Sequence, residues 1–330
     1  MGDLWIIPVL ICKIFNDFYV FSLFSDIIHS MRRLLIILGG IMLILLVGCT
    51  RNGATQSQQA SSSISATSTS AYIQNAGSDT IVNLALAWAE RYQKVKPGVS
   101  ISVTGGGSGT GLSSLLNKTT DIANASRQIS AEELTTAKKE GLNPQEFVIA
   151  RDAIAVVVNP ENPVDNLTIE QLSKIYRGEI NNWQEVGGDD RPIVRLSRET
   201  NSGTHVYFLD AVIRLGDSND KTIFSRDTLL LPSSEGIIAE VRDNPNAIGY
   251  DGLGYVTSEV KMVAISGLKT PDVYVLPSAK TVSDNSYVIS RNLYMYTQNP
   301  PTGAIKEYLD WILSADAQQI VIDLGFVPVK

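Results

Sequence analysis

Four short segments of this sequence combine hydroxyl residues, glycines and arginines at points where a predicted strand is followed by a predicted helix. Backbone N–H groups in the first turn of a helix carry partial positive charge, and neighbouring hydroxyl groups add donors, so this combination suits a small anion. The four segments are residues 76–80, 104–111, 121–130 and 198–205. Because one design recurs, the sequence predicts an anion site built from several helix starts.

The first segment leads into a predicted amphipathic helix. Apolar residues recur at helical spacing from Ile81 to Val95, and Ser78 stands where a side chain caps the first turn. Thr80 adds a second hydroxyl group to the same turn. The alternative is an ordinary helix cap, in which Asp79 only complements the helix dipole.

The second segment is rich in glycine, with five glycines in the seven positions 105–111. Glycine lets the backbone approach a ligand closely, and Ser108 and Thr110 add hydroxyl groups. A plain flexible turn is the alternative. Enzyme motifs fail here, since a nucleotide phosphate loop needs lysine where Leu112 stands and a serine-hydrolase elbow needs glycine where Thr110 stands.

The third and fourth segments each bring an arginine beside hydroxyl groups. Arg127 follows Ser126 at the end of an apolar stretch, and Arg198 precedes Ser202, Gly203 and Thr204 by a short loop. A guanidinium group can grip two oxygen atoms of an anion at once. We expect the Arg198 side chain to fold back over the amides and hydroxyls of that loop. A solvated surface arginine is the alternative for Arg127.

The alternative hypothesis from a different functional class is a secreted phosphatase or another hydrolase. Ser108 or Ser202 would be its nucleophile, and a nucleophilic serine needs a base. His205 is the only histidine in a chain that begins at Cys49, and Cys12 and Cys49 are the only cysteines. The sequence therefore predicts no metal site, no internal disulfide and no cofactor. We expect a binding protein rather than an enzyme.

The elements that must position these segments alternate along the chain. Short β-branched runs and helical patterns follow one another from residue 71 onward, which indicates an α/β fold. Residues 151–159 are predicted to form a buried strand, and capping-box patterns at Ser130 and Thr168 predict two helix starts. Further elements are predicted at residues 244–255 (one short strand), 285–298 (strands that return to the first unit) and 303–317 (a helix).

The N-terminal region is predicted to direct the chain out of the cytoplasm. Residues 31–49 combine Arg32 and Arg33 with a short apolar run that ends in a lipobox-like sequence, so Cys49 is the predicted lipidated residue. An uncleaved membrane anchor is the alternative. Residues 1–30 are interpreted as an over-long start, or as a first membrane helix, and residues 50–70 as a flexible tether.

The overall charge restricts the partners of the protein. With 27 basic and 34 acidic residues the net charge is -7, and the computed pI is about 5.0. Such a chain is not expected to bind nucleic acid or anionic membrane surfaces through its general charge. Any anion site must therefore be local.

Together the four segments resemble the phosphate-binding proteins of phosphate-specific ABC importers. The likeness runs from about residue 74 to the C-terminus and includes residues 175–178, 182–183 and 247–250. It implies a two-lobed periplasmic-binding-protein type II fold, with mixed sheets flanked by helices and the ligand between the lobes. The implied lobes are residues 71–153 with 257–330, and residues 154–256. It also implies a monomer that delivers phosphate to permease subunits.

The resemblance implies a phosphate site formed by residues from all four segments. Family ligand positions match Ser78, Thr80, Ser108, Ser126, Arg127, Arg198, Ser202, Gly203 and Thr204. Many family members have an aspartate that accepts the phosphate proton near the place of Arg127, and Asp79 is the candidate for that role here. Such an acceptor favours phosphate over sulfate, which carries no proton at neutral pH.

The sequence alone leaves two related functions open. Another tetrahedral oxyanion, such as sulfate or molybdate, would use the same kind of site. A signalling or adhesion protein that senses phosphate would use the same residues.

Overall fold

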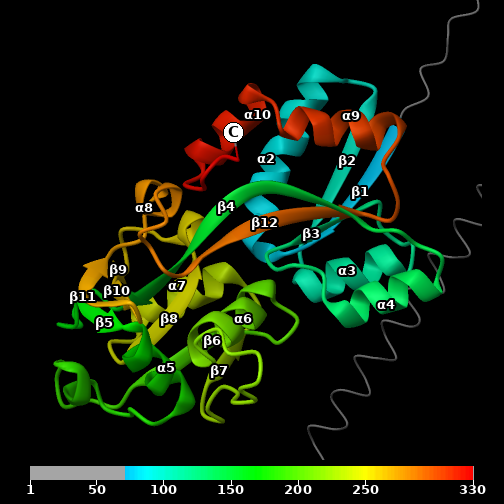
Figure 1. Cartoon of the computed structure of the whole chain (residues 1–330). Helices are drawn as coiled ribbons and strands as arrows, with labels where there is room; N and C mark the ends of the chain where they lie inside the picture. The colour runs from blue at the N-terminus through cyan, green and yellow to red at the C-terminus, as the bar shows by residue number, and fades with distance from the viewer. Residues whose placement is uncertain (1–70, 330) are drawn as a thin grey trace, which may run out of the picture. The chain divides into compact units, whose positions relative to one another are not determined.

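The computed structural model describes residues 71–329. The predicted signal sequence, lipidated Cys49 and tether lie outside these residues. A nine-stranded sheet runs through the described part, and Figure 1 shows its course. Its strand order is β2 (Val99–Thr104), β1 (Ala71–Gly77), β3 (Ile122–Ala125), β12 (Ser290–Thr297), β4 (Gln145–Val158), β8 (Ala247–Gly252), β6 (Val194–Arg198) and β7 (Leu229–Leu231), with β9 (Lys261–Met262) also paired to β4.

Strand β4 belongs to two lobes at once. Residues 145–153 pair with β12 beside β3, whereas residues 154–158 pair with β8. The predicted strand at residues 151–159 is confirmed and starts earlier, because Gln145 to Ala150 extend the pairing with β12. One core lies around Trp88 and Ile149, and another around Trp183 and Val156. The described residues therefore form an α/β structure with two lobes, as predicted.

In the first lobe, helices cover both faces of the sheet (Figure 1). On one face, α2 (Asp79–Val95), α9 (Gly303–Ile312) and α10 (Ala315–Asp323) pack around Trp88 and Tyr308. On the other, α3 (Ser108–Leu116) packs Leu112 and Leu115 against β3 and β12, and α4 (Ala131–Lys139) packs Ala137 against Leu116. The single helix predicted over residues 303–317 is wrong. Ser314 caps a second helix by accepting a hydrogen bond from the Ala317 N–H.

The second lobe contains α5 (Ile169–Arg177), α6 (Gly203–Phe208) with a π-helical continuation (Leu209–Ile213), α7 (Ser234–Asp243) and α8 (Ala279–Ser283). Short 3₁₀ turns lie at Trp183–Val186 and Leu253–Tyr255, and a small sheet joins β11 (Thr270–Val275), β10 (Ala264–Gly267) and β5 (Asn166–Thr168). The capping boxes predicted at Ser130 and Thr168 are both present.

The chain returns to the first lobe later than the boundary predicted at residue 257. Strand β9 pairs with the second-lobe part of β4, and β10 pairs with β5. Val263, Val282 and Ile289 also pack into the core around Trp183. The contacts therefore change lobes at Ser290, where β12 begins.

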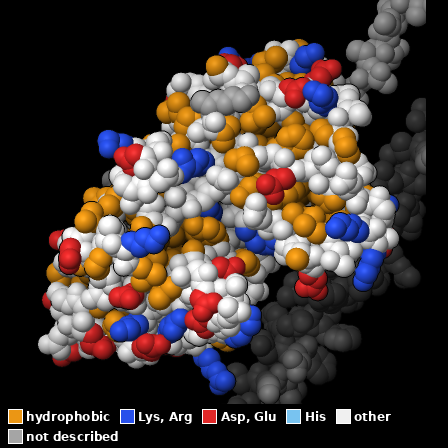
Figure 2. Space-filling model, viewed as in Figure 1, with side chains coloured by type: hydrophobic (Ala, Val, Ile, Leu, Met, Phe, Trp, Pro, Cys, Tyr) orange, Lys and Arg blue, Asp and Glu red, His pale blue; other side chains and the backbone are white. Residues whose placement is uncertain are grey.

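The surface shows no segregation of charge on the face drawn in Figure 2, where basic and acidic side chains are interspersed. None of the helices within residues 71–329 is both long enough and apolar enough to cross a membrane.

Candidate anion-binding site

Three buried serines meet where neighbouring parallel strands of the first lobe end. Ser78 follows β1, Ser126 follows β3, and Ser108 opens α3 after β2. The Ser78 hydroxyl donates to Ser126 Oγ at 3.0 Å, and Ser108 Oγ accepts from the Ser126 N–H at 3.0 Å. Ser108 Oγ and Ser126 Oγ lie 3.3 Å apart. The first, second and third segments are thus brought together as predicted.

The second lobe supplies the fourth segment to the same place. Thr204, in the first turn of α6, lies with its Oγ1 2.9 Å from Thr80 Oγ1 at the start of α2. Gly203 packs directly on the serine cluster: a Cβ atom there would lie 2.3 Å from Ser108 Oγ and 2.5 Å from Ser126 Oγ. Only glycine permits this approach, so at this point the second lobe contacts the serine cluster through its backbone.

Ser78 and Ser202 both occupy helix cap positions but have different local roles. Ser202 Oγ accepts from the Thr204 N–H at 3.2 Å and so caps α6. Ser78 occupies the cap position of α2 without making a side-chain cap, because its hydroxyl points to Ser126 instead. The predicted capping role of Ser78 is therefore wrong, and its hydroxyl belongs to the serine cluster.

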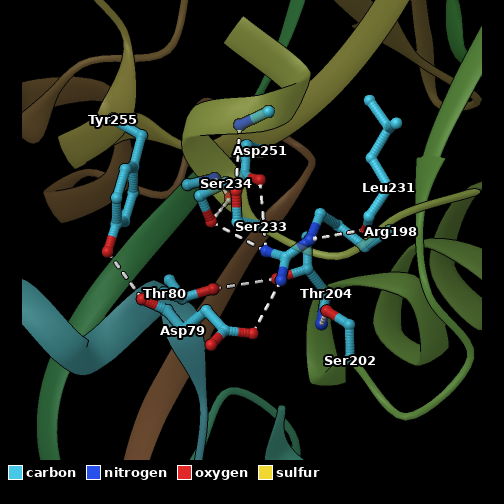
Figure 3. A network of polar contacts seen from close by, with 12 residues as sticks. Asp79, Thr80, Arg198, Ser202, Thr204, Leu231, Ser233, Ser234, Asp251 and Tyr255 are labelled. Atoms are coloured by element: carbon cyan, nitrogen blue, oxygen red, sulfur yellow. Dashed lines mark hydrogen bonds and ion pairs between the residues drawn. The ribbon is translucent and has the colours of Figure 1, made fainter. Parts of the chain in front are cut away.

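Arg198 lies at the lobe junction with its side chain 1% exposed (Figure 3). Its guanidinium donates to Asp79 Oδ2 at 2.7 Å across the lobes, and to Ser234 Oγ at 2.7 Å and the Pro232 carbonyl at 2.8 Å within its own lobe. Asp251 Oδ2 lies 3.5 Å away. The expectation that Arg198 folds over Ser202 to Thr204 is not met, since these acceptors draw it toward α2 and α7.

Arg127 makes its side-chain contacts outside the serine cluster. Its two terminal nitrogens donate to the two carboxylate oxygens of Glu133, each at 2.8 Å, and Nη1 also donates to the Gln128 carbonyl. Burial alone would raise the pKa of Glu133, but the hydrogen bonds from Arg127 and Ser130 outweigh it and lower that pKa. The structure therefore pairs the Arg127 guanidinium with the start of α4 and not with the hydroxyl groups of the serine cluster.

Arg291, which the sequence reasoning missed, lies beside the cluster instead. Its Nη2 donates to Thr204 Oγ1 at 3.0 Å and lies 3.4 Å from Thr80 Oγ1, and its Nη1 donates to the Ser126 carbonyl at 3.1 Å. Asp152 Oδ2 accepts from both Nη2 and Nε. The available signal was an aspartate and an arginine inside two predicted strands, where charged residues need a partner.

The site balances two guanidinium groups against three carboxylates, those of Asp79, Asp152 and Asp251. Burial raises the pKa of Asp152 to about 6, although Arg291 opposes the shift. Burial likewise raises the pKa of Asp251, against the effect of Arg198. Asp152 and Asp251 are therefore each held beside a cation in a place that disfavours their charge.

His205 is not placed to serve Ser202 as a base. Its Nδ1 lies 3.0 Å from Ser197 Oγ, and its ring stacks on Phe224 with centroids 4.4 Å apart. Burial lowers the pKa of this imidazole. Within the described residues, no group of three or more histidine, cysteine or acidic side chains is arranged to hold a metal ion.

A cleft of about 700 Å³ opens beside the serine cluster. Its walls come from both lobes and include Ser126, Arg127, Tyr207, Arg291 and Tyr294. The guanidinium carbon of Arg291 lies 5.8 Å from the centre of the Tyr207 ring. Arg291 therefore lines this cleft and also contacts the hydroxyl groups of the lobe junction.

A two-lobed structure with an anion-type site between its lobes is typical of solute-binding proteins, and the family comparison agrees. Residues 62–316 match the model of the PBP superfamily domain. The phosphate-binding protein PstS of Bacillus subtilis is 31% identical over 303 residues, which is 90% of this chain and 94% of that protein. The PstS of Borreliella burgdorferi is 30% identical over 256 residues, 77% of this chain and 88% of that protein.

Solved structures give the same result. A putative phosphate ABC transporter substrate-binding protein from Clostridium perfringens, with bound phosphate, is 33% identical at a TM-score of 0.70 and covers 78% of this chain and 100% of its own. A phosphate transport receptor from Vibrio cholerae is 29% identical at a TM-score of 0.62, covering 77% and 99%. The chain belongs to the PBP superfamily, and within it to the family of PstS phosphate-binding proteins.

Proposed function

We propose that this protein binds inorganic phosphate outside the cytoplasm and delivers it to an ABC importer. The observation that carries the proposal is the convergence of hydroxyl groups from both lobes, with Ser78, Ser108 and Ser126 on one side and Thr204 on the other. Hydroxyl groups, main-chain amides and guanidinium groups are the donors that a tetrahedral oxyanion needs. The relatives named for phosphate binding support phosphate as that anion.

The proposed ligand set keeps most of the residues predicted from the sequence. Asp79, Arg198, Ser202 and Gly203 belong to it with the four hydroxyl residues just named, together with Thr80. Arg127 is left out, because both ends of its guanidinium group are engaged by Glu133. In this arrangement closure of the lobes brings α6 onto the serine cluster, which is the hinge motion expected of a binding protein.

The protein would act by binding and release, without chemistry on the anion. The hydrolase alternative would need Ser202 as nucleophile with His205 as its base. Instead, Ser202 Oγ caps α6 and His205 pairs with Ser197, so the two residues do not form such a pair. We further propose that Cys49 carries a lipid anchor and that residues 50–70 tether a monomeric binding unit near the permease. Metabolic labelling with a radioactive fatty acid tests the anchor, since Cys49→Ala should abolish incorporation.

Calorimetric titration of the full-length protein, purified in detergent, with phosphate, sulfate and molybdate tests the proposed ligand. We expect phosphate to bind at least about a hundredfold more tightly than either competitor. Tighter binding of sulfate or molybdate would overturn the choice of anion. Release of product from a chromogenic phosphate ester would overturn the choice of a binding function.

A further inference from the structure

Arg291 and Asp152 occupy the two strands that connect the lobes. They are directly opposite each other in the antiparallel pairing of β12 with β4. Opposite residues in such a pair project from the same face of the sheet. Because β4 runs into both lobes and β12 begins where the chain leaves the second lobe, the Arg291–Asp152 pair lies at the hinge.

The guanidinium of Arg291 reaches three of the four segments of the anion site. One nitrogen contacts a threonine from each lobe, Thr80 at 3.4 Å and Thr204 at 3.0 Å. The other terminal nitrogen contacts the Ser126 carbonyl at 3.1 Å. Arg198, by contrast, donates to acceptors on α2, on α7 and in the loop before α7.

Arg291 is both buried and charged, and such a side chain is uncommon where only a structural role is required. Its side chain is 2% exposed and that of Asp152 is 0% exposed. A buried guanidinium needs acceptors for its five N–H groups. Asp152 accepts through Oδ2 from Nε and Nη2, whereas its Oδ1 accepts from the Leu253 N–H. Nη1 donates to the Ser126 carbonyl, and Nη2 also contacts the Thr80 and Thr204 hydroxyl groups, which an anion can displace.

We propose that Arg291 is the second guanidinium of the phosphate site and that Asp152 is a positioning residue that holds it at the hinge. This inference rests on the proposed phosphate function and replaces Arg127 in the predicted role. Phosphate would contact one threonine from each lobe and an arginine fixed to the connecting strands. Ligand recognition and lobe closure would thus depend on the same cation.

The test compares phosphate affinities of full-length variants in detergent by calorimetry. Arg291→Gln should lose about a hundredfold or more in affinity, and Arg291→Lys should recover part of it because charge returns without the bidentate geometry. Asp152→Asn should lose about tenfold, with recovery in Asp152→Glu. Arg127→Gln is the matched control and should bind as the wild type does.

One further variant separates the possible results. The double change Arg291→Gln with Asp152→Asn removes both buried charges, so it tests affinity if the single variant does not fold. Wild-type affinity in a folded Arg291→Gln variant or double variant would overturn the inference and leave the proposed function intact. A loss in Arg127→Gln equal to that in Arg291→Gln would also overturn it. A wild-type protein with no phosphate affinity would overturn both proposals.

Discussion

The Asp79 carboxylate joins the two lobes, because its Oδ2 lies 2.7 Å from Nη2 of Arg198 while its Oδ1 accepts from the Gly106 N–H at 2.8 Å. This single side chain therefore fixes the start of α2, the glycine-rich loop and the end of β6 relative to one another. Its position at the junction fits either of two roles, as a latch for the closed lobes or as the acceptor of the phosphate proton.

Asp79→Asn should weaken phosphate binding by about tenfold to a hundredfold, because an amide cannot replace a charged partner for a buried guanidinium. If Asp79 also accepts the phosphate proton, the same change should narrow the difference in affinity between phosphate and sulfate. Titration of both anions checks this. An unchanged difference would exclude Asp79 as the proton acceptor and leave only the latch.

Gly203→Ala should prevent the closed arrangement, since the added methyl group would lie within 2.5 Å of two serine oxygens. We expect phosphate affinity to fall by at least about a hundredfold. The free energy of unfolding measured without phosphate should change little, because the clash arises only when the lobes close. Gly98→Ala is the control, because a Cβ atom there meets nothing within 4 Å. Equal affinities in the two variants would contradict the packing described for Gly203.

Ser126→Ala removes the hydroxyl group that links Ser78 and Ser108. The loss of one hydrogen bond to a charged ligand should lower phosphate affinity by about tenfold to a hundredfold. Ser283→Ala, which removes an exposed hydroxyl bonded only within its own helix, should leave the affinity unchanged. Calorimetric titration with phosphate compares the two, and a larger effect of Ser283→Ala would count against the serine cluster as the binding site.

The raised pKa of Asp152 predicts a pH-dependent stability. The folded-state pKa of about 6 lies above the ordinary value of 3.8, so the folded protein retains this proton in a range where the unfolded chain has lost it. Stability from this group is therefore present at low pH and is lost as the pH rises toward 6. Between pH 4.5 and 7.5, the wild type should lose about 2 kcal/mol of unfolding free energy relative to Asp152→Asn.

Chemical denaturation of both proteins at these pH values measures that difference. Groups other than Asp152, including His205, titrate in both proteins and largely cancel in the comparison. A relative change of the opposite sign would show that the pair with Arg291 outweighs the burial of Asp152.

The parts of the fold and site that depend on neighbouring residues could be predicted from the sequence. The capping boxes at Ser130 and Thr168 are interactions between residues three apart, and both were found. The convergence of the first three segments also follows from parallel strands that end at one edge of a sheet. The fourth segment follows β6, which runs in the opposite direction in the other lobe, so its approach could not be deduced in this way. Arg291 and Asp152 are 139 residues apart, and no local pattern joins them. Nor does a sequence show that Glu133 competes for Arg127.

The strand pairings depart from the predicted lobe boundary at residue 257 for a related reason. Residues 244–255 carry turn signals that favour a change of lobe, and the chain does turn there. Yet β9 adds to the second-lobe part of β4, and this pairing is fixed by the position of β4 in space. Hydrophobic pattern alone does not say on which lobe a short strand is placed.

The 14-residue strand β4 carries one further consequence, for the way in which the molecule comes apart. Residues 145–153 of this strand pair with β12 and residues 154–158 pair with β8, so the loss of either lobe would leave one part of a continuous strand without its partner. The interior amides of this strand should consequently exchange with deuterium only through global opening. Hinge bending and unfolding thus involve the same backbone, but at very different free energies.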